Sequence, residues 1–218
     1  MNRFLGLTFI FLFFIGCSLA QDCKEGINLI PMYGGSPKCE QQIKSDNDFF
    51  AFVDSKFKDR KVAALSYVEL GWDYFYKNDL ETSMKRFNQA WLLDSLNADV
   101  YWGFGNLLGR KGDLKASIPF FKKSLKLKPD NAKVYESLAT SYGQSFATTQ
   151  EASLLNKAIE SLKIADNLDR NNPRILAQLT SAYSYFSQKD SAYKYLRLTD
   201  QLDQKAIHPK VRELLKQK

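Results

Sequence analysis

The chain has few of the residues on which catalytic and metal sites depend: one histidine, three cysteines and 11 glycines in 218 residues. The lone His208 lies far in sequence from every plausible nucleophile, so a Ser-His-Asp or Cys-His arrangement has little support. A zinc site needs about four nitrogen, sulfur or oxygen ligands, and the chain cannot supply them. No glycine-rich phosphate loop occurs, since Gly103 and Gly105 fall inside a helical pattern. We therefore expect no enzyme, no metal and no cofactor.

Glycine and proline are too scarce for a low-complexity chain, and 44% of the residues are hydrophobic. This composition predicts a folded protein of one domain, or at most two. The net charge is +7, from 31 basic and 24 acidic residues. Such a charge suits nucleic acid, anionic lipid or an acidic partner. The N-terminus makes nucleic acid the weakest of these three.

The N-terminus has the layout of a secretory signal peptide. Arg3 precedes an apolar run, 4–15, and the small-residue stretch 16–20 follows it. The run is shorter than the roughly 20 apolar residues that span a membrane, and no later segment is apolar enough either. We expect an exported protein, in the periplasm or associated with the outer membrane or cell envelope.

Two processing schemes fit this region. Cleavage after Ala20 would make 1–20 the signal peptide. Alternatively, Phe14-Ile15-Gly16-Cys17 resembles a bacterial lipobox, in which case the signal is 1–16 and Cys17 carries a lipid. That lipid would be the only membrane contact. Both schemes stay open.

Either scheme leaves Cys23 and Cys39 as the two cysteines of the exported chain apart from a lipidated residue. Oxidising compartments favour a disulfide between them. The bridge would close a short loop that has too few apolar residues to form its own core. It would add about 3 kcal/mol to the free energy of unfolding. Two unpaired thiols are the alternative.

The chain repeats itself at a shift of 34 residues. The shift aligns Tyr67 with Tyr101 and Tyr135, Leu70 with Phe104 and Leu138, Gly71 with Gly105 and Ala139, and Ser83 and Phe87 with Ser117 and Phe121. The next matches come 41 residues later, at Ala158 and Leu162, so seven extra residues lie between Tyr142 and Ala158. The 34-residue period then resumes.

This pattern resembles the tetratricopeptide-repeat family. The resemblance covers four units, at 64–97, 98–131, 132–172 and 173–206. It implies an all-α fold, a right-handed α-solenoid of four helix pairs. Small residues such as Gly71 let two helices approach closely, and stacked units bury one continuous core.

Three further segments flank the repeats. We expect 21–45 to be an irregular segment bearing the disulfide. Apolar residues at near-helical spacing within 46–63 predict a capping helix in front of the first unit. The last residues, 207–218, are expected to form a short helix or a tail.

The resemblance also implies a binding face formed by the first helix of each unit, with a protein or peptide as the partner. The candidate partner-binding residues are Trp102, Asn106, Arg110, Lys133, Glu136 and Gln144. They offer an aromatic anchor, amides that can pair with a peptide backbone, and cations for acidic groups. The alternative is a solvated face without a partner.

A second surface is defined by Lys122, Lys123 and Lys126, which the helical pattern turns outward. Solvation explains such lysines, and contact with anionic polymer or lipid is the other possibility. The sequence thus predicts a non-catalytic scaffold that binds a protein in the cell envelope. The alternative is a structural accessory, tethered by lipid or its N-terminal segment, that contacts anionic material through this basic outer face.

Overall fold

The computed structural model describes residues 23–186 and 188–217. The predicted signal peptide and Cys17 lie outside these residues. The α-helices are α1 Glu40–Lys56, α2 Arg60–Tyr76, α3 Leu80–Leu93, α4 Ala98–Arg110, α5 Leu114–Leu127, α6 Ala132–Thr149, α7 Ala152–Leu168, α8 Pro173–Tyr185, α9 Lys189–Leu202 and α10 Pro209–Lys216. Short 3-10 turns are η1 Ile27–Leu29, η2 Pro31–Gly35 and η3 Gln204–Ala206.

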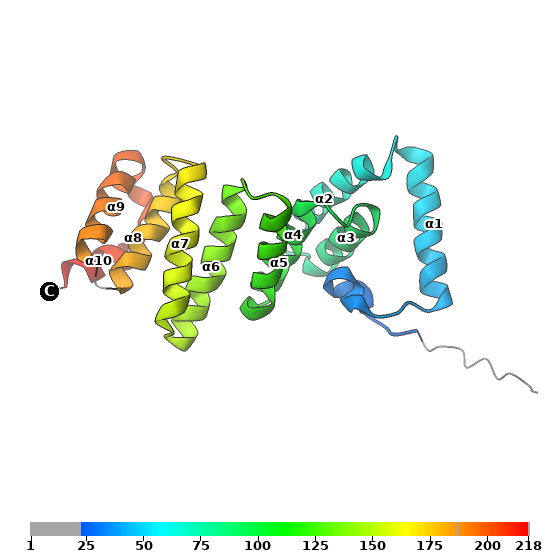
Figure 1. Cartoon of the computed structure of the whole chain (residues 1–218), viewed down its shortest axis with the longest axis horizontal. Coiled ribbons are helices and arrows are strands. Elements are labelled where there is room, and N and C mark those ends of the chain that lie inside the picture. Colours follow the sequence, from blue (N-terminus) through cyan, green and yellow to red (C-terminus); the bar gives the residue numbers. More distant parts are fainter. Residues whose placement is uncertain (1–22, 187, 218) are drawn as a thin grey trace, which may run out of the picture.

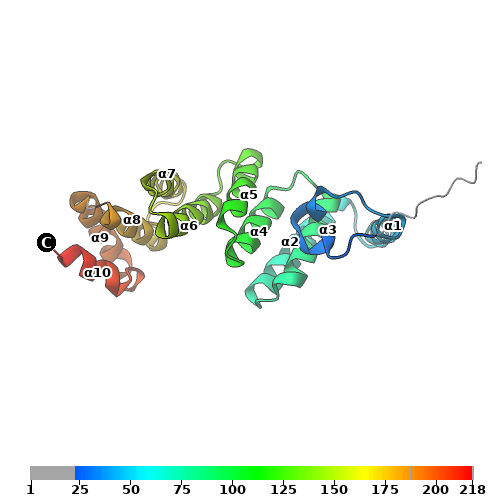
Figure 2. The same cartoon turned by 90° about the horizontal axis from the view of Figure 1, so that it is seen from below.

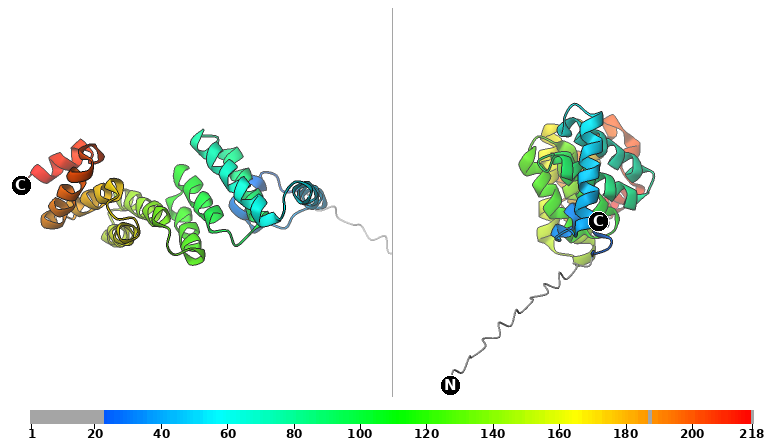
Figure 3. Two further views of the ribbon diagram at one scale, coloured as in Figure 1. Left: turned by 90° about the horizontal axis from the view of Figure 1, so that it is seen from above. Right: turned by 90° about the vertical axis from the view of Figure 1, so that its right-hand side faces the viewer.

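The helices form four antiparallel pairs stacked in a row, which confirms the predicted α-solenoid. The pairs are α2 with α3, α4 with α5, α6 with α7, and α8 with α9, and each pair contacts the next (Figure 1). Viewed from above, α1 and α10 lie at opposite ends of the row (Figure 3). Each unit buries its apolar face only against its neighbours.

Polar caps set where the second helix of the first two units begins. The Asp79 carboxylate accepts a hydrogen bond from the Thr82 amide at 3.0 Å, and Asp113 accepts from the Ala116 amide at 3.0 Å. The residues before them, Asn78 and Gly112, have left-handed backbone with φ of 62° and 85°. Asparagine and glycine tolerate that conformation, so both turns reverse the chain within a few residues.

Phenylalanine rings fill the space that glycines leave between helices. A Cβ atom on Gly103 would lie 2.4 Å from the Phe87 ring, and one on Gly71 would lie 2.8 Å from it. On Gly105, a Cβ atom would lie 2.5 Å from the Phe121 ring. These glycines are required by close packing, as the sequence predicts for Gly103 and Gly105.

The seven extra residues of the third unit lengthen its helices and do not form a loop. Helix α6 has 18 residues where α4 has 13, and α7 has 17 where α5 has 14. The link between α6 and α7, residues 150–151, is correspondingly short. Both helices therefore extend about one turn beyond those of the second unit.

The boundaries of the capping helix differ from the sequence prediction of 46–63. Helix α1 begins six residues earlier, at Glu40, and ends at Lys56. The Asp59 carboxylate then accepts from the Val62 amide at 2.8 Å and starts α2, so 60–63 belongs to the first repeat. A cap of this kind marks the residue at which a helix starts. The spacing of apolar residues alone does not show that position. Helix α1 packs on α2 through Val53, which is fully buried, and Phe49.

From Cys23 to Cys39 the chain forms two short 3-10 turns joined by irregular backbone, as expected of the irregular segment 21–45, but the residues from Glu40 onward belong to α1. This segment contains η1 and η2, and Cys23 and Cys39 form the predicted disulfide. Both 3-10 turns lie against α3 (Figure 2). The buried Asn88 amide donates to the carbonyl oxygens of Asn28 and Ile30, each at 2.9 Å. One side chain thereby fixes the segment to the first repeat.

The C-terminal helix α10 closes the other end of the row, as predicted. It packs against α8 and α9. The Tyr193 hydroxyl donates to the Leu215 carbonyl oxygen at 2.7 Å, and Arg212 forms an ion pair with Asp200. Leu215 is buried, so α10 covers apolar surface that the last unit would otherwise expose to water.

Candidate functional site

The structure brings all six predicted partner-binding residues to one groove. The groove has a volume of about 660 Å³ and runs across α2, α4 and α6. It is lined by Trp102, Asn106, Arg110, Lys133, Glu136 and Gln144, together with Trp72, Phe75, Tyr76 and Arg174. Residues that are far apart in sequence meet here because the first helix of each unit lines the same face.

Trp102 is partly a packing residue. Its ring lies 4.4 Å from that of Trp72, centroid to centroid, and its indole nitrogen donates to Ser137 Oγ at 3.0 Å. The Asn106 amide nitrogen donates to the Trp102 carbonyl oxygen at 2.8 Å. The two side chains are half-buried and held in place before any partner binds.

Glu136 has its partners within the chain. Its carboxylate is buried and accepts from the Arg174 guanidinium at 2.5 Å and from the Gln178 amide at 2.7 Å. Both partners belong to α8. Glu136 therefore joins the third unit to the fourth, and its negative charge is neutralised inside the groove.

Arg110, Lys133 and Gln144 are exposed on the groove wall. The Arg110 guanidinium lies 4.9 Å above the Phe75 ring, a cation–π contact. Within residues 23–186 and 188–217, no ion pair involves Arg110 or Lys133. Glu136 is the one carboxylate that lines this part of the described chain, so the groove carries a net positive charge.

The groove continues into a second compartment, which is lined by only one of the six candidate residues, Gln144. This apolar compartment of about 630 Å³ lies between α6, α7 and α8. It is lined by Ala139, Gly143, Phe146, Ala147, Gln150, Leu155, Ala158, Leu162, Ala177, Gln178, Ser181, Ala182, Tyr185, Ala206 and His208. Thr140, Gln144 and Arg174 line both compartments. Small residues at 143, 147, 177 and 181 were the sequence signal for this space.

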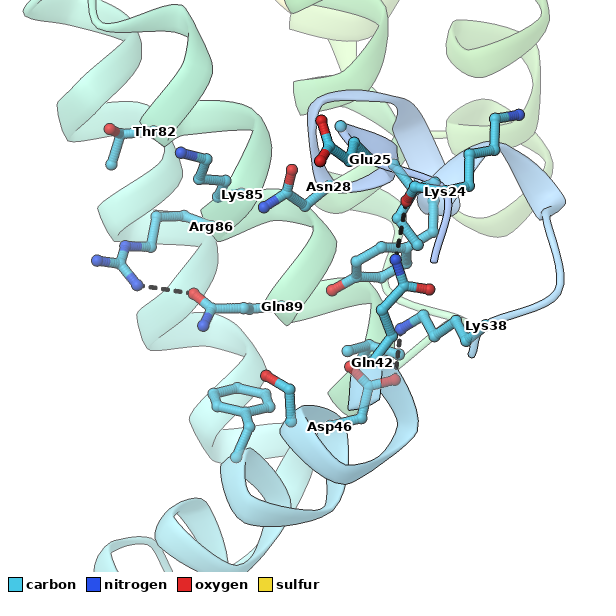
Figure 4. A pocket seen from close by; sticks show the side chains of 16 residues that line it. Lys24, Glu25, Asn28, Lys38, Gln42, Asp46, Thr82, Lys85, Arg86 and Gln89 are labelled. Atoms are coloured by element: carbon cyan, nitrogen blue, oxygen red, sulfur yellow. Dashed lines mark hydrogen bonds and ion pairs between the residues drawn. The ribbon is translucent and has the colours of Figure 1, made fainter. Parts of the chain in front are cut away.

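A third cavity lies between the disulfide-bearing segment, α1 and α3 (Figure 4). It has a volume of about 350 Å³ and mixed charge. Gln42 donates to the Lys24 carbonyl oxygen at 2.9 Å, and Lys38 forms an ion pair with Asp46 across the opening. Tyr33 lines the cavity, and burial raises the pKa of its hydroxyl far above the ordinary value. Sequence could not predict this cavity, because its walls come from separate segments.

The lysines of the basic outer face are exposed on α5, as the sequence predicts. Lys122, Lys123 and Lys126 are all open to solvent. The Lys123 ammonium also makes a cation–π contact with the Tyr101 ring, at 5.6 Å from the ring centroid.

The described part of the chain contains no cluster of three or more histidine, cysteine, aspartate or glutamate side chains that could hold a metal ion. None of its helices combines the length and the apolar character needed to cross a membrane.

Comparison with known proteins identifies the repeat. The tetratricopeptide repeat family matches residues 98–131, the second predicted unit. No curated protein matches the chain. Among solved structures, YrrB, described as a TPR protein with an unusual peptide-binding site, is 21% identical with a TM-score of 0.57; the match covers 71% of this chain and 74% of YrrB.

Two further solved structures share the fold. MamA is 18% identical with a TM-score of 0.57, over 76% of this chain and 94% of MamA. TTC0263, a thermophilic TPR protein of Thermus thermophilus, is 15% identical with a TM-score of 0.57, over 70% of this chain and 79% of that protein. At these identities the likeness concerns the fold alone.

Proposed function

We propose that the chain is a tetratricopeptide-repeat protein and a non-catalytic scaffold that binds a segment of a partner protein in its groove. The observation that supports this most directly is the meeting of Trp102, Asn106, Arg110, Lys133 and Gln144 on one groove wall. The first helix of each of the four units contributes to the two compartments, so binding there would depend on the whole stack. YrrB, which shares the fold, is described as having a peptide-binding site.

The groove chemistry suits a peptide. The fixed Trp102 ring offers apolar contact area at little entropic cost, because its neighbours already hold it. Gln144 and Thr140 can pair with backbone amides and carbonyls of an extended segment. Arg110 and Lys133 favour acidic side chains, and their contribution should weaken with salt.

A catalytic role has little to support it. The His208 ring accepts a hydrogen bond from the Lys210 backbone amide at 3.2 Å and so caps α10. Cys23 and Cys39 are joined in the disulfide. The groove residues that carry charge are cations and one paired carboxylate. This set lacks a nucleophile next to a base.

We also propose that the protein acts in the cell envelope, after export. The signal-like sequence of residues 1–20 supports this, and so does the Cys23–Cys39 disulfide, because disulfides persist in oxidising compartments. An intact mass of the purified protein separates the two processing schemes. Cleavage after Ala20 gives a chain without lipid, whereas lipoprotein processing gives a lipidated Cys17 as the first residue.

Crosslinking capture from intact cells tests the groove. The test variant carries Asn106→Ala and Lys133→Ala, and the matched control carries Lys122→Ala and Lys123→Ala on α5. We expect the specific partner to be lost with the groove variant and kept with the control, at unchanged helical content. Loss with the control alone would favour the basic outer face and anionic envelope material as its ligand.

A further inference from the structure

The apolar compartment is a product of the seven-residue insertion. Helix α4 ends at Arg110, which aligns with Gln144 in α6. Phe146 and Ala147 lie beyond that point, in the extra turn, and both line the compartment. Phe146 lies against Tyr185 of α8, with ring centroids 6.1 Å apart. The insertion thus adds an apolar wall that the second unit lacks.

Gly143 of α6 lines this compartment and has open space beside it. A Cβ atom on Gly143 would meet no atom within 4 Å, although Gly143 lies in the middle of α6. At the equivalent position of the second unit, a Cβ atom on Gly109 would meet only Ser141 Oγ, at 3.9 Å. Neither glycine has a positive φ. Packing within the chain therefore requires glycine at neither position, unlike Gly103.

Charge is distributed unequally along the groove. The unpaired cations Arg110 and Lys133 line the first compartment. In the described chain, the second compartment is lined by no carboxylate, and its one basic residue besides His208 is Arg174, which is paired with Glu136. An occupant that spans both compartments meets positive charge at one end and an apolar wall at the other.

We infer that the groove selects a partner segment that carries a bulky apolar side chain, seated above Gly143, and acidic residues beside it, opposite Arg110 and Lys133. This inference rests on the proposed function and specifies the partner. The exposed Tyr185 ring and Phe146 form the contact wall for the apolar side chain. Water displaced from these apolar surfaces supplies affinity, and the cations supply preference for acidic neighbours.

The test begins with a displayed library of random peptides, from which those that bind the protein are selected and then synthesised. Their affinity is measured by fluorescence anisotropy for the native chain, for Gly143→Leu and for Gly109→Leu. Each leucine should project into open groove space. Because leucine favours a helix more than glycine does, both variants should melt at or above the native temperature, so lost binding does not reflect misfolding.

We expect enriched peptides with an aromatic or large aliphatic residue next to aspartate or glutamate. Gly143→Leu should weaken the binding at least tenfold, as should alanine in place of the apolar peptide residue. The two changes combined should weaken the binding little further, because they remove one contact. Replacing the acidic peptide residues with amides should weaken the native binding and reduce its dependence on salt.

Different results would contradict this inference and the proposed function. If Gly109→Leu weakens the binding and Gly143→Leu changes it less than threefold, the groove binds peptide but the apolar compartment does not select it. Selection of basic or wholly polar peptides overturns the inference in the same way. If no peptide is enriched, or if neither variant affects binding, the groove proposal fails as well.

Discussion

The glycines of the repeat helices divide into two groups by what surrounds them. At Gly71, Gly103 and Gly105 an added Cβ atom would lie within 3 Å of a phenylalanine ring. At Gly109 and Gly143 it would meet open groove space or ordinary contact. Sequence alone predicted the close packing of Gly103 and Gly105, because both fall in a helical pattern. It could not separate them from Gly109, since the difference lies in a neighbouring helix.

This division gives opposite predictions for the same substitution. Gly103→Ala should destabilise the chain by about 1–3 kcal/mol, because the Phe87 ring has to move. Gly109→Ala should stabilise it by about 0.5–1 kcal/mol, since alanine favours the helix and meets no clash. Urea unfolding followed by circular dichroism measures both. Equal effects of the two substitutions would contradict the packing account.

Elements were predicted from sequence with uneven success. The 34-residue period and the polar caps locate the helices of the repeats, because each unit repeats the same local pattern. The limits of α1 were missed, because the helical spacing of its apolar residues does not show where the helix begins or ends, and the cap at Asp59 assigns 60–63 to α2. The apolar compartment was missed because it needs α6, α7 and α8 to be placed together.

The N-terminal segment depends on its disulfide. Changing Cys23 and Cys39 to serine opens a loop of 16 residues and should lower the free energy of unfolding by about 3 kcal/mol. It should also raise the hydrogen exchange of residues 27–35, which lie against α3. Asn88→Ala, with the disulfide intact, serves as a matched variant that loosens the same residues by removing two hydrogen bonds. Unchanged exchange in both variants would show that the segment is held by other contacts.

The docking of α10 should depend on pH. The hydrogen bond from Arg212 holds the pKa of the Asp200 carboxyl below its ordinary value. A lowered pKa in the folded state stabilises the fold above the unfolded value of about 3.9, and this contribution is lost as the pH falls through the folded pKa. Amide NMR shifts of residues 209–216 should therefore titrate with a midpoint below about 3.9.

The variant Asp200→Asn is the control for this titration. It should abolish that midpoint and loosen α10 at neutral pH, because the amide carries no charge to pair with Arg212. A midpoint at or above about 3.9 in the native protein would contradict the role given to this ion pair.

At the scale of the whole molecule, the stack of four helix pairs turns separate residues into one continuous groove. Each first helix contributes a few side chains, and no single unit forms either compartment. The six candidate residues could be located from sequence because repeat position determines which side a residue faces. Their charges could not be judged that way, since the Glu136 pair with Arg174 joins two units.

Site-specific photocrosslinking in intact cells tests the central claim most directly. A photoreactive amino acid is placed at Gln144, which is exposed and lines both compartments, and separately at Lys122 on the outer face of α5. The account predicts a specific protein adduct from position 144, which Gly109→Leu abolishes, and none from position 122. A specific adduct from position 122 with none from position 144 would contradict it and move the working surface to the basic outer face.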